Sequence, residues 1–257
     1  MKPLLEPAGR EALLAFARPD TLIALDYDGT LAPIAARPPE AHMRPETREL
    51  LARLCRRFPV LILTGRARAD VLGFLGGTGA LEVIGSHGLE KFGTTIGRVG
   101  ERVARWRQAL VQRIGAMVGI DIEDKRLSLA VHFRRAPDGD AAQRQIEEAV
   151  ADLPGARILG GKKVVNVVPS EAPDKGAALL AACERGGYRR AIYVGDDDTD
   201  EDVFRLAQPE RILTVRIGRQ RESAAEYYLA DQRDIDRLMR VLLDAAPAGA
   251  LHRPSPI

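Results

Sequence analysis

Short apolar runs alternate with stretches of helical spacing in the first third of the chain. The apolar runs, typical of buried strands, cover residues 21–25, 60–63 and 81–84. The stretches between them, with apolar residues three or four apart, cover residues 45–58 and 67–75. This alternation predicts a parallel sheet covered by helices.

The pattern changes in the middle of the chain and then returns. Residues 93–172 predict a helix, a hairpin, a second helix and a second hairpin, which cover residues 99–117, 120–133, 141–153 and 156–168. Afterwards helices and strands alternate again, over residues 175–185, 191–194, 203–207, 212–217 and 235–245. We therefore predict an α/β core built from residues 1–92 and 173–257, with an α+β domain of residues 93–172 inserted into it.

Composition narrows the function classes. The chain has 257 residues, of which 46% are apolar and 29% charged. This composition is typical of a folded globular protein. A net charge of +2 without a run of five Lys or Arg argues against nucleic-acid binding. Apolar runs too short to span a membrane, two distant cysteines and no secretory cleavage motif predict no membrane association and a cytoplasmic location.

Charge differs between the two predicted parts. Residues 93–172 hold 13 Lys+Arg and 10 Asp+Glu, a net charge of +3, and the rest holds 25 and 26, a net charge of −1. A basic insert fits a lid over an anionic substrate. A solvated helix face explains most of these arginines equally well, so both interpretations stay open.

The first chemical signal is the sequence Asp26-Tyr27-Asp28-Gly29-Thr30 after the first predicted strand. Ligands of open α/β sheets bind at the carboxyl ends of strands. Two carboxylates separated by one residue can act on one centre, one as nucleophile and the other as acid and base. The alternative is an Asp-Gly turn that caps a helix.

A second signal is an acidic run after another predicted strand. Six of the seven residues from 196 to 202 are Asp or Glu, and such crowding repels itself unless a cation or a helix N-terminus compensates. Oxygen ligands without His or Cys favour a hard ion, and Mg²⁺ fits a site shared with a phosphate. The alternative is an exposed acidic loop in which Thr199 and Asp200 cap a helix, an interpretation that suits Asp198, Glu201 and Asp202.

Two further groups suit a phosphate. Thr64 and Gly65 follow a predicted strand and offer a hydroxyl and a free N–H at a helix start. Lys175 begins a predicted helix, where a cation is poorly placed for the helix dipole unless a phosphate lies nearby.

These motifs resemble those of the haloacid dehalogenase (HAD) superfamily of phosphatases. The matching groups, in order, are Asp26-Tyr27-Asp28-Gly29-Thr30, Thr64, Lys175 and Gly195-Asp196-Asp197. Within that superfamily the chain looks like the trehalose-6-phosphate phosphatase family. The local matches include Thr64-Gly65-Arg66, Gly85-Ser86-His87-Gly88, Glu123-Asp124-Lys125, His132-Phe133-Arg134 and Gly161-Lys162-Lys163. The resemblance implies a Rossmann-like parallel sheet core with an inserted α+β cap.

The resemblance also implies roles for these residues. Asp26 would be the nucleophile and Asp28 the general acid and base, with Thr64, Gly65 and Lys175 holding the phosphoryl oxygens. Mg²⁺ would be bound by Asp26, the backbone carbonyl of Asp28 and Asp196, with Asp197 beside it. The residues implied to contact the sugar or the hinge are Arg66, His87, Gly88, Glu123, Lys125, Arg134, Lys162 and Asn166.

One position departs from the family pattern. A Glu stands four residues after the Gly-Lys lysine in the family, and this chain has Asn166 there. Asn lacks the charge and can donate as well as accept. We therefore keep three hypotheses: hydrolysis of trehalose 6-phosphate, hydrolysis of another phosphorylated sugar or sugar-like alcohol, and binding of a sugar phosphate without catalysis. The expected partner is a small phosphosugar, supplied in the first case by a separate trehalose-6-phosphate synthase.

Other residues have simpler interpretations. His132 lies beside Phe133 in a predicted hairpin and is interpreted as a packed or surface histidine. Trp106 stands among arginines and is interpreted as packing the insert. His87 suits a turn cap as well as a ligand contact.

Overall fold

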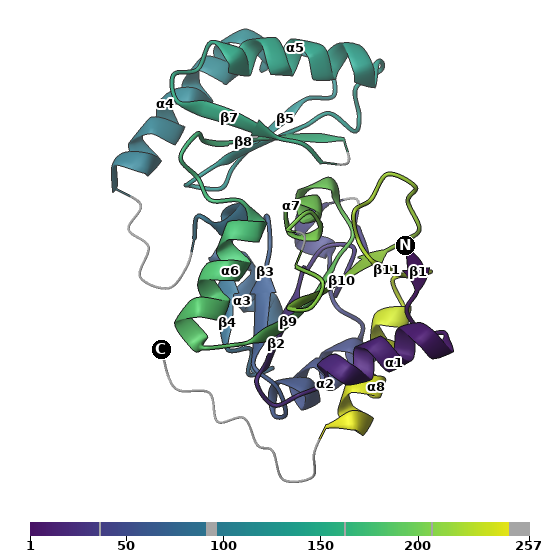
Figure 1. Cartoon of the computed structure of the whole chain (residues 1–257). Coiled ribbons are helices and arrows are strands. Elements are labelled where there is room, and N and C mark those ends of the chain that lie inside the picture. Colours follow the sequence, from purple (N-terminus) through teal and green to yellow (C-terminus); the bar gives the residue numbers. More distant parts are fainter. Residues whose placement is uncertain (36, 91–96, 162, 207, 247–257) are drawn as a thin grey trace. The chain divides into compact units, whose positions relative to one another are not determined.

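The computed structural model describes residues 1–35, 37–90, 97–161, 163–206 and 208–246. Its chain divides into two compact units (Figure 1). Unit 1 combines residues 1–92 with residues 174–257, and unit 2 is formed by residues 93–173. Each unit has its own hydrophobic core, as described below.

Unit 1 is built on a seven-stranded sheet in which all neighbouring strands are parallel. In spatial order the strands are β1 (Lys2–Pro3), β11 (Tyr227–Leu229), β10 (Ile212–Ile217), β9 (Arg190–Gly195), β2 (Thr21–Leu25), β3 (Val60–Leu63) and β4 (Glu82–Ile84). The central strands are buried on both faces, which explains their continuous apolar runs. All seven carboxyl ends therefore meet at one edge of the sheet.

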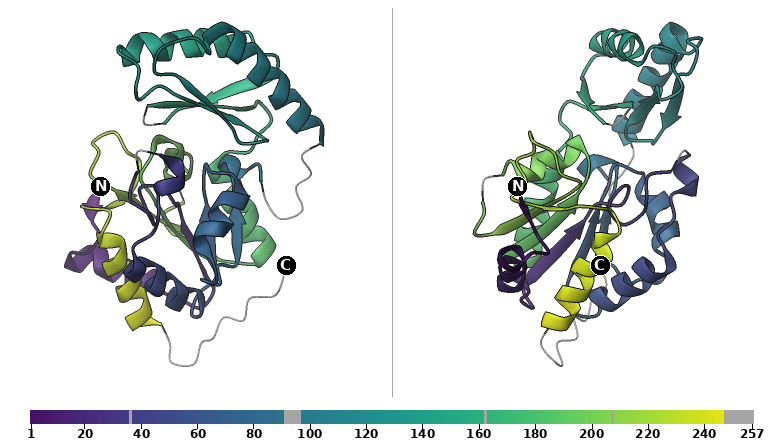
Figure 2. Two further views of the ribbon diagram at one scale, coloured as in Figure 1. Left: turned by 180° about the vertical axis from the view of Figure 1, so that it is seen from behind. Right: turned by 90° about the vertical axis from the view of Figure 1, so that its right-hand side faces the viewer.

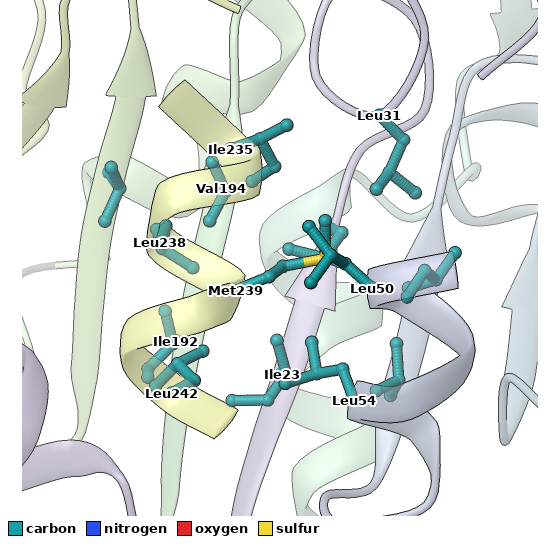
Figure 3. Close-up of a cluster of buried hydrophobic side chains, with 14 of the residues drawn as sticks. Ile23, Leu31, Leu50, Leu54, Ile192, Val194, Ile235, Leu238, Met239 and Leu242 are labelled. Carbon is teal, nitrogen blue, oxygen red and sulfur yellow. The ribbon is translucent and has the colours of Figure 1, made fainter. Parts of the chain in front are cut away.

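Helices cover both faces of this sheet (Figure 2). The helices of unit 1 are α1 (Pro7–Phe16), α2 (Pro45–Cys55), α3 (Arg68–Leu75), α6 (Lys175–Gly186), α7 (Glu201–Phe204) and α8 (Asp234–Ala245). Side chains of α1, α2, α3 and α8 pack with Ile23 and Leu25 on one face, and those of α6 and α7 pack with Leu22 and Ala24 on the other. Figure 3 shows the first cluster, in which α8 and α2 meet over Ile23 and Ile192.

Three short 3₁₀ helices lie in the loops of unit 1. They are η1 (Pro38–Glu40), η2 (Ser86–Gly88) and η3 (Asp198–Asp200). Since η2 and η3 follow β4 and β9, they lie at the carboxyl edge of the sheet. Both carry residues that the sequence singles out.

Unit 2 is an antiparallel sheet with helices packed on one face. Its elements are α4 (Gly97–Ile114), β5 (Asp121–Asp124), β6 (Leu129–His132), α5 (Gly139–Ala151), β7 (Ala156–Leu159) and β8 (Val164–Pro169). The strands lie in the order β5-β6-β8-β7, and all pairs are antiparallel. Trp106 and Leu110 of α4 pack with Ile146 of α5 against Leu129 and Val167 of the sheet. The interpretation of Trp106 as a core residue is confirmed.

The α/β class, with a parallel sheet and a second α+β part, is confirmed by these elements. Both predicted hairpins form, as β5-β6 and β7-β8. The helix predicted over residues 203–207 instead covers Glu201–Phe204, and residue 207 lies outside the described residues. The sequence analysis assigned no element to α1, β1 or β11.

The described part of the chain contains no helix that could span a membrane. None of its helices combines the length and the apolar character needed to cross a bilayer.

Candidate active site

Asp26 stands where β2 ends, at the carboxyl edge of the sheet. Its backbone N–H donates to the Val194 carbonyl at 2.9 Å, which continues the pairing of β2 with β9 by one residue. The side chain is buried, with 4% of its surface exposed. Because this edge is where open α/β sheets bind ligands, a buried carboxylate here marks the candidate site.

Lys175 neutralises part of the negative charge around Asp26. Its Nζ donates to Asp26 Oδ1 at 2.9 Å and to Asp200 Oδ1 at 2.6 Å, and the residue is 2% exposed. Burial alone would lower the pKa of Lys175, but the carboxylates of Asp200 and Asp26 outweigh it and raise that pKa well above its usual range. The same two carboxylates offset the cost of a cation at the start of α6.

Asp200 belongs to the same cluster, although the sequence analysis gave it only a capping role. Its Oδ2 accepts from the backbone N–H groups of Asp196 and Asp197, both at 2.8 Å, so it does cap η3. Its Oδ1 accepts from Lys175 and from the Tyr193 hydroxyl at 2.6 Å. Burial would raise the pKa of Asp200, but Lys175 and the hydrogen bond from Tyr193 lower it overall.

Gly195, the residue before the acidic run, is the one sequence feature that points to a buried Asp200. A Cβ at Gly195 would lie 2.3 Å from the Asp200 carboxyl carbon, so the residue before the acidic run must lack a side chain. The exposed-loop interpretation is wrong for Glu201, which is 6% exposed and accepts from Arg216 Nη1 at 3.1 Å. Four of the six acidic residues of the run, Asp196, Asp197, Asp200 and Glu201, are therefore structural or part of the site.

Three buried carboxylates of the described chain could hold a metal ion together. One oxygen each of Asp26, Asp196 and Asp200 lies within 4.8 Å of the others. Burial raises the pKa of Asp26, and Asp200, Asp196 and Asp28 raise it further, against the opposing effect of Lys175. This crowding favours a bound cation, and the oxygen-only donor set fits a hard ion such as Mg²⁺.

The other predicted metal residues lie beside this cluster. Asp197 uses its side chain in a capping box with the backbone of Asp200. Asp28 lies in the turn after Asp26, and next to it Gly29 has φ = +77°. A Cβ at Gly29 would lie 2.3 Å from the Asp196 carboxylate, so this glycine allows the turn to approach Asp196. The ligand set proposed from the sequence stays a prediction.

Arg66 binds Asp28 with both arms of its guanidinium. Nε donates to Oδ2 at 2.5 Å and Nη2 donates to Oδ1 at 2.6 Å. The Arg66 guanidinium also lies 5.7 Å from the ring centre of Tyr27 and 5.3 Å from that of Phe74, and these two rings are stacked. The residue predicted to contact substrate is thus held against the predicted acid and base.

Thr64, Gly65 and His87 form a second part of the same edge. Thr64 follows β3 and is 1% exposed, and its carbonyl accepts from the His87 N–H at 3.0 Å. His87 has φ = 57° in η2, and Gly88 follows it with φ = 110°. A Cβ at Gly65 would lie 2.4 Å from His87 Cε1, so the glycine allows the imidazole to lie against the backbone.

The remaining predicted residues lie in unit 2. Glu123 of β5 pairs with Ala130 of β6, and Ala130 pairs with Asn166 of β8, so Glu123 and Asn166 share one face of the sheet. The Glu123 carboxylate also lies 2.8 Å from His132 Nε2, a partner that the sequence analysis did not give this histidine.

The predicted cations of unit 2 are spread along the same hairpin. Lys125 follows β5 at one end of the β5-β6 ladder, and Arg134 follows β6 at the other end. Lys162 lies outside the described residues.

Comparison with known proteins places the chain in a family. The model of the family described as Trehalose-phosphatase matches residues 24–233, which include every site residue of unit 1 and all of unit 2. The chain belongs to the trehalose-phosphatase family. It is therefore a phosphoric monoester hydrolase, and the predicted resemblance is confirmed.

A curated relative agrees with this membership, and solved structures share the fold. The chain is 32% identical to trehalose 6-phosphate phosphatase RA3 of Zea mays over 264 residues, which cover 90% of this chain and 72% of that protein. The C-terminal domain of the Candida albicans trehalose-6-phosphate phosphatase superposes with a TM-score of 0.77 at 21% identity, over 95% of this chain and 98% of that one. A HAD-superfamily phosphatase of Bacteroides thetaiotaomicron shares the fold, with a TM-score of 0.61 at 14% identity over 88% of this chain and 95% of the other.

Proposed function

We propose that this member of the trehalose-phosphatase family hydrolyses trehalose 6-phosphate to trehalose and phosphate through an aspartyl-phosphate intermediate. The observation that carries the proposal is the buried Asp26 carboxylate, bound to Lys175 at the ligand-binding edge of a parallel sheet. The choice of substrate is supported by the trehalose-phosphatase family and by the Zea mays relative, which is named a trehalose 6-phosphate phosphatase.

In the first half of the reaction, a carboxylate oxygen of Asp26 attacks phosphorus. The bond from phosphorus to the sugar oxygen breaks, and Asp28 gives a proton to that oxygen as the sugar leaves. We assign to Lys175 and the Thr64 hydroxyl the stabilisation of charge on the phosphoryl oxygens. A positioned acid such as Asp28 accelerates departure by about 10²–10⁴-fold.

In the second half, water attacks the phosphorus of the aspartyl phosphate. Asp28 takes a proton from that water, the bond from phosphorus to the Asp26 oxygen breaks, and phosphate leaves. The bidentate hydrogen bonds from Arg66 fix the position of the Asp28 carboxyl group for both halves of the reaction.

We propose that Asp26, Asp196 and the Asp28 carbonyl hold Mg²⁺, with Asp197 beside the ion. Asp200, whose two oxygens already accept four hydrogen bonds, positions Lys175 next to this site. The support is the buried cluster of three carboxylates and the raised pKa of Asp26 that burial and the neighbouring acids cause. When bound, the ion supplies positive charge to the phosphoryl oxygens.

We propose residues 93–172 as the specificity domain and residues 1–92 with 173–257 as the catalytic core. Glu123 and Asn166 share one face of the specificity domain's sheet, and carboxylate and amide groups are typical partners of sugar hydroxyls. Arg66, His87, Gly88, Lys125, Arg134 and Lys162 remain proposed substrate or hinge contacts from the sequence. We place the reaction in trehalose biosynthesis, after a separate synthase, in the cytoplasm.

The deciding experiment is phosphate release with Mg²⁺, with and without EDTA. The substrates are trehalose 6-phosphate, sucrose 6-phosphate, glucose 6-phosphate and an aryl phosphate. We expect turnover that favours trehalose 6-phosphate, that stops with EDTA, and that falls by at least about 10³-fold in Asp26→Asn. Undiminished turnover by Asp26→Asn would overturn the nucleophile.

Asn166 supports a second candidate, another phosphorylated sugar. If the aryl phosphate is hydrolysed and trehalose 6-phosphate is not, the sugar is different. Replacing Asn166 with Glu then tests the position. A shift of preference among the sugar phosphates, with aryl phosphate turnover unchanged, would place residue 166 at the sugar.

A further inference from the structure

Gln232 connects the start of α8 to the loop that carries Asp26 and Asp28. Its Nε2 donates to the Thr30 carbonyl at 2.7 Å, a contact between residues 202 positions apart in the chain. Thr30 is fully buried, so its carbonyl is removed from bulk solvent. A buried carbonyl that loses its hydrogen bond costs free energy, so this contact matters for the loop.

The same loop is otherwise closed by its own backbone. The N–H of Gly29 donates to the Ala32 carbonyl at 2.7 Å, and those of Leu31 and Ala32 donate to the Tyr27 carbonyl at 2.9 and 2.8 Å. The Thr30 carbonyl is instead bound from outside the loop, by Gln232 just before α8. The loop is therefore fixed to the sheet at Asp26 and, at Thr30, to the segment that leads into α8.

The orientation of the Gln232 amide follows from the chemistry of its neighbours. Arg44 Nη1 donates to Gln232 Oε1, and a guanidinium can only donate. The Thr30 carbonyl can only accept, so the amide nitrogen must face it. A flipped amide would set two donors against each other and two acceptors against each other.

Arg44 is itself held by a buried acid on α8. Its Nη2 donates to Asp236 Oδ2 at 2.9 Å, and the Thr47 hydroxyl donates to Asp236 Oδ1 at 2.7 Å. Asp236 is 5% exposed and Thr47 is fully buried. Leu31 of the catalytic loop belongs to the same apolar cluster as Ile235 of α8 (Figure 3). The amide of Gln232 is thus fixed by polar contacts and by the packing of α8.

We propose that Gln232 is a positioning residue, which acts through the Thr30 carbonyl to hold Asp26 and Asp28 in the geometry that catalysis needs. The chemical role of the loop rests on the proposed function, and the hydrogen-bonded connection to α8 does not. Small displacements of reacting groups reduce turnover strongly, so loss of the contact lowers kcat.

The variant that tests this is Gln232→Glu. A carboxylate still accepts from Arg44, but it has no donor for the Thr30 carbonyl and places a negative oxygen beside it. The hydrogen bond with Arg44 is therefore kept, and the hydrogen bond to the Thr30 carbonyl is lost. We expect kcat to fall on the order of 10- to 100-fold, with KM changed by less than about 3-fold.

Two control variants separate positioning from general effects. Gln112→Glu makes the same chemical change on the exposed face of α4 and should leave kcat and stability unchanged. Val241→Ala removes packing of α8 without touching the polar contacts, so it should lower the unfolding temperature and leave kcat unchanged. If kcat falls as much in Val241→Ala as in Gln232→Glu, the role of Gln232 is merely structural and the proposal is overturned.

Two readouts separate this proposal from the proposed function. The loss of kcat should be equal for trehalose 6-phosphate and for an aryl phosphate, because the loop acts on the phosphoryl group. Hydrogen exchange at the amides of Gly29, Leu31 and Ala32 should be faster in Gln232→Glu than in wild type, whatever the substrate is. Unchanged exchange together with unchanged kcat would overturn the proposal even if trehalose 6-phosphate is confirmed as substrate.

Discussion

At the scale of single residues, the site gathers charges that the fold alone would not favour. Asp26 is buried beside Asp196 and Asp200 with Lys175 as its cation. Its pKa is raised, chiefly by burial, so its ionised form opposes folding in the absence of a metal ion. The proposed role of Asp26 as nucleophile therefore competes with stability at this position.

This competition predicts that Asp26→Asn stabilises the metal-free protein. A carboxyl whose folded pKa is raised contributes stability below its unfolded pKa and loses it as pH rises through the folded pKa. In EDTA at pH 7.5 we expect an unfolding temperature about 2–4 °C above wild type, with a smaller difference near pH 5. Calorimetry at both pH values checks this, and a less stable variant at pH 7.5 would contradict it.

Arg66 gives a second prediction at this scale. Lysine keeps the charge but cannot make the bidentate contact with Asp28. If Arg66 acts on Asp28, Arg66→Lys lowers kcat by about 10-fold or more for both a sugar phosphate and an aryl phosphate. A rise of KM for the sugar phosphate alone would instead assign Arg66 to the sugar, and steady-state kinetics on both substrates distinguish the two.

At the scale of elements, the loop after β3 and the loop after β4 lie close together because Gly65 has no side chain to meet the His87 ring. Gly65→Ala would place a Cβ 2.4 Å from the His87 ring, which must then move. We expect a loss of about 1–3 kcal/mol in the free energy of unfolding and weaker inhibition by inorganic phosphate. The measurements are denaturant unfolding and inhibition kinetics.

The controls for Gly65→Ala come from the same chain. Gly73 lies inside α3 with no atom within 4 Å of an added Cβ, so Gly73→Ala should be neutral or stabilising by up to about 1 kcal/mol. Adding His87→Ala to Gly65→Ala removes the clash and should restore part of the lost stability. Simple additivity of the two changes would show that the ring and the glycine are not coupled.

How much the sequence predicts also differs between elements. The strands 21–25 and 60–63 have the predicted bounds because proline or polar residues flank clear apolar runs. β1 and β11 have two and three residues, too few to show a period. β11 forms on the parallel edge that β10 offers, and β1 forms on the edge of β11. In the site, Asp26 and Asp196 follow from motifs after strands, whereas Gln232 and Asp236 have no local signal and needed the packing of α8.

At the scale of the whole molecule, two separate cores suggest two unfolding transitions. Trp106, the single tryptophan, lies in the core of unit 2, with its indole nitrogen donating to the Pro154 carbonyl at 3.2 Å. Leu238 is fully buried in unit 1. Tryptophan fluorescence therefore reports on unit 2, and circular dichroism reports on both units.

The prediction is that Leu238→Ala affects only one of the two signals. It should lower the free energy of unfolding of unit 1 by about 2–5 kcal/mol. In circular dichroism, the transition of unit 1 should then occur at a lower denaturant concentration. The denaturant midpoint of the Trp106 fluorescence should stay within error of wild type. An equal shift of both midpoints would show that the two units unfold as one.

The order of strands in unit 1 also constrains the order in which parts of the chain can fold during synthesis. β2 lies between β3 and β9, so one of its edges stays bare until residues 190–195 have been synthesised. Unit 2 lies between these segments and holds all of its own strands, so it can fold first as the chain leaves the ribosome. Asp26 is translated early, but Lys175, Asp196 and Asp200 join it only after unit 2 has emerged. The candidate active site at the carboxyl edge of the sheet is therefore among the last parts of the molecule to assemble.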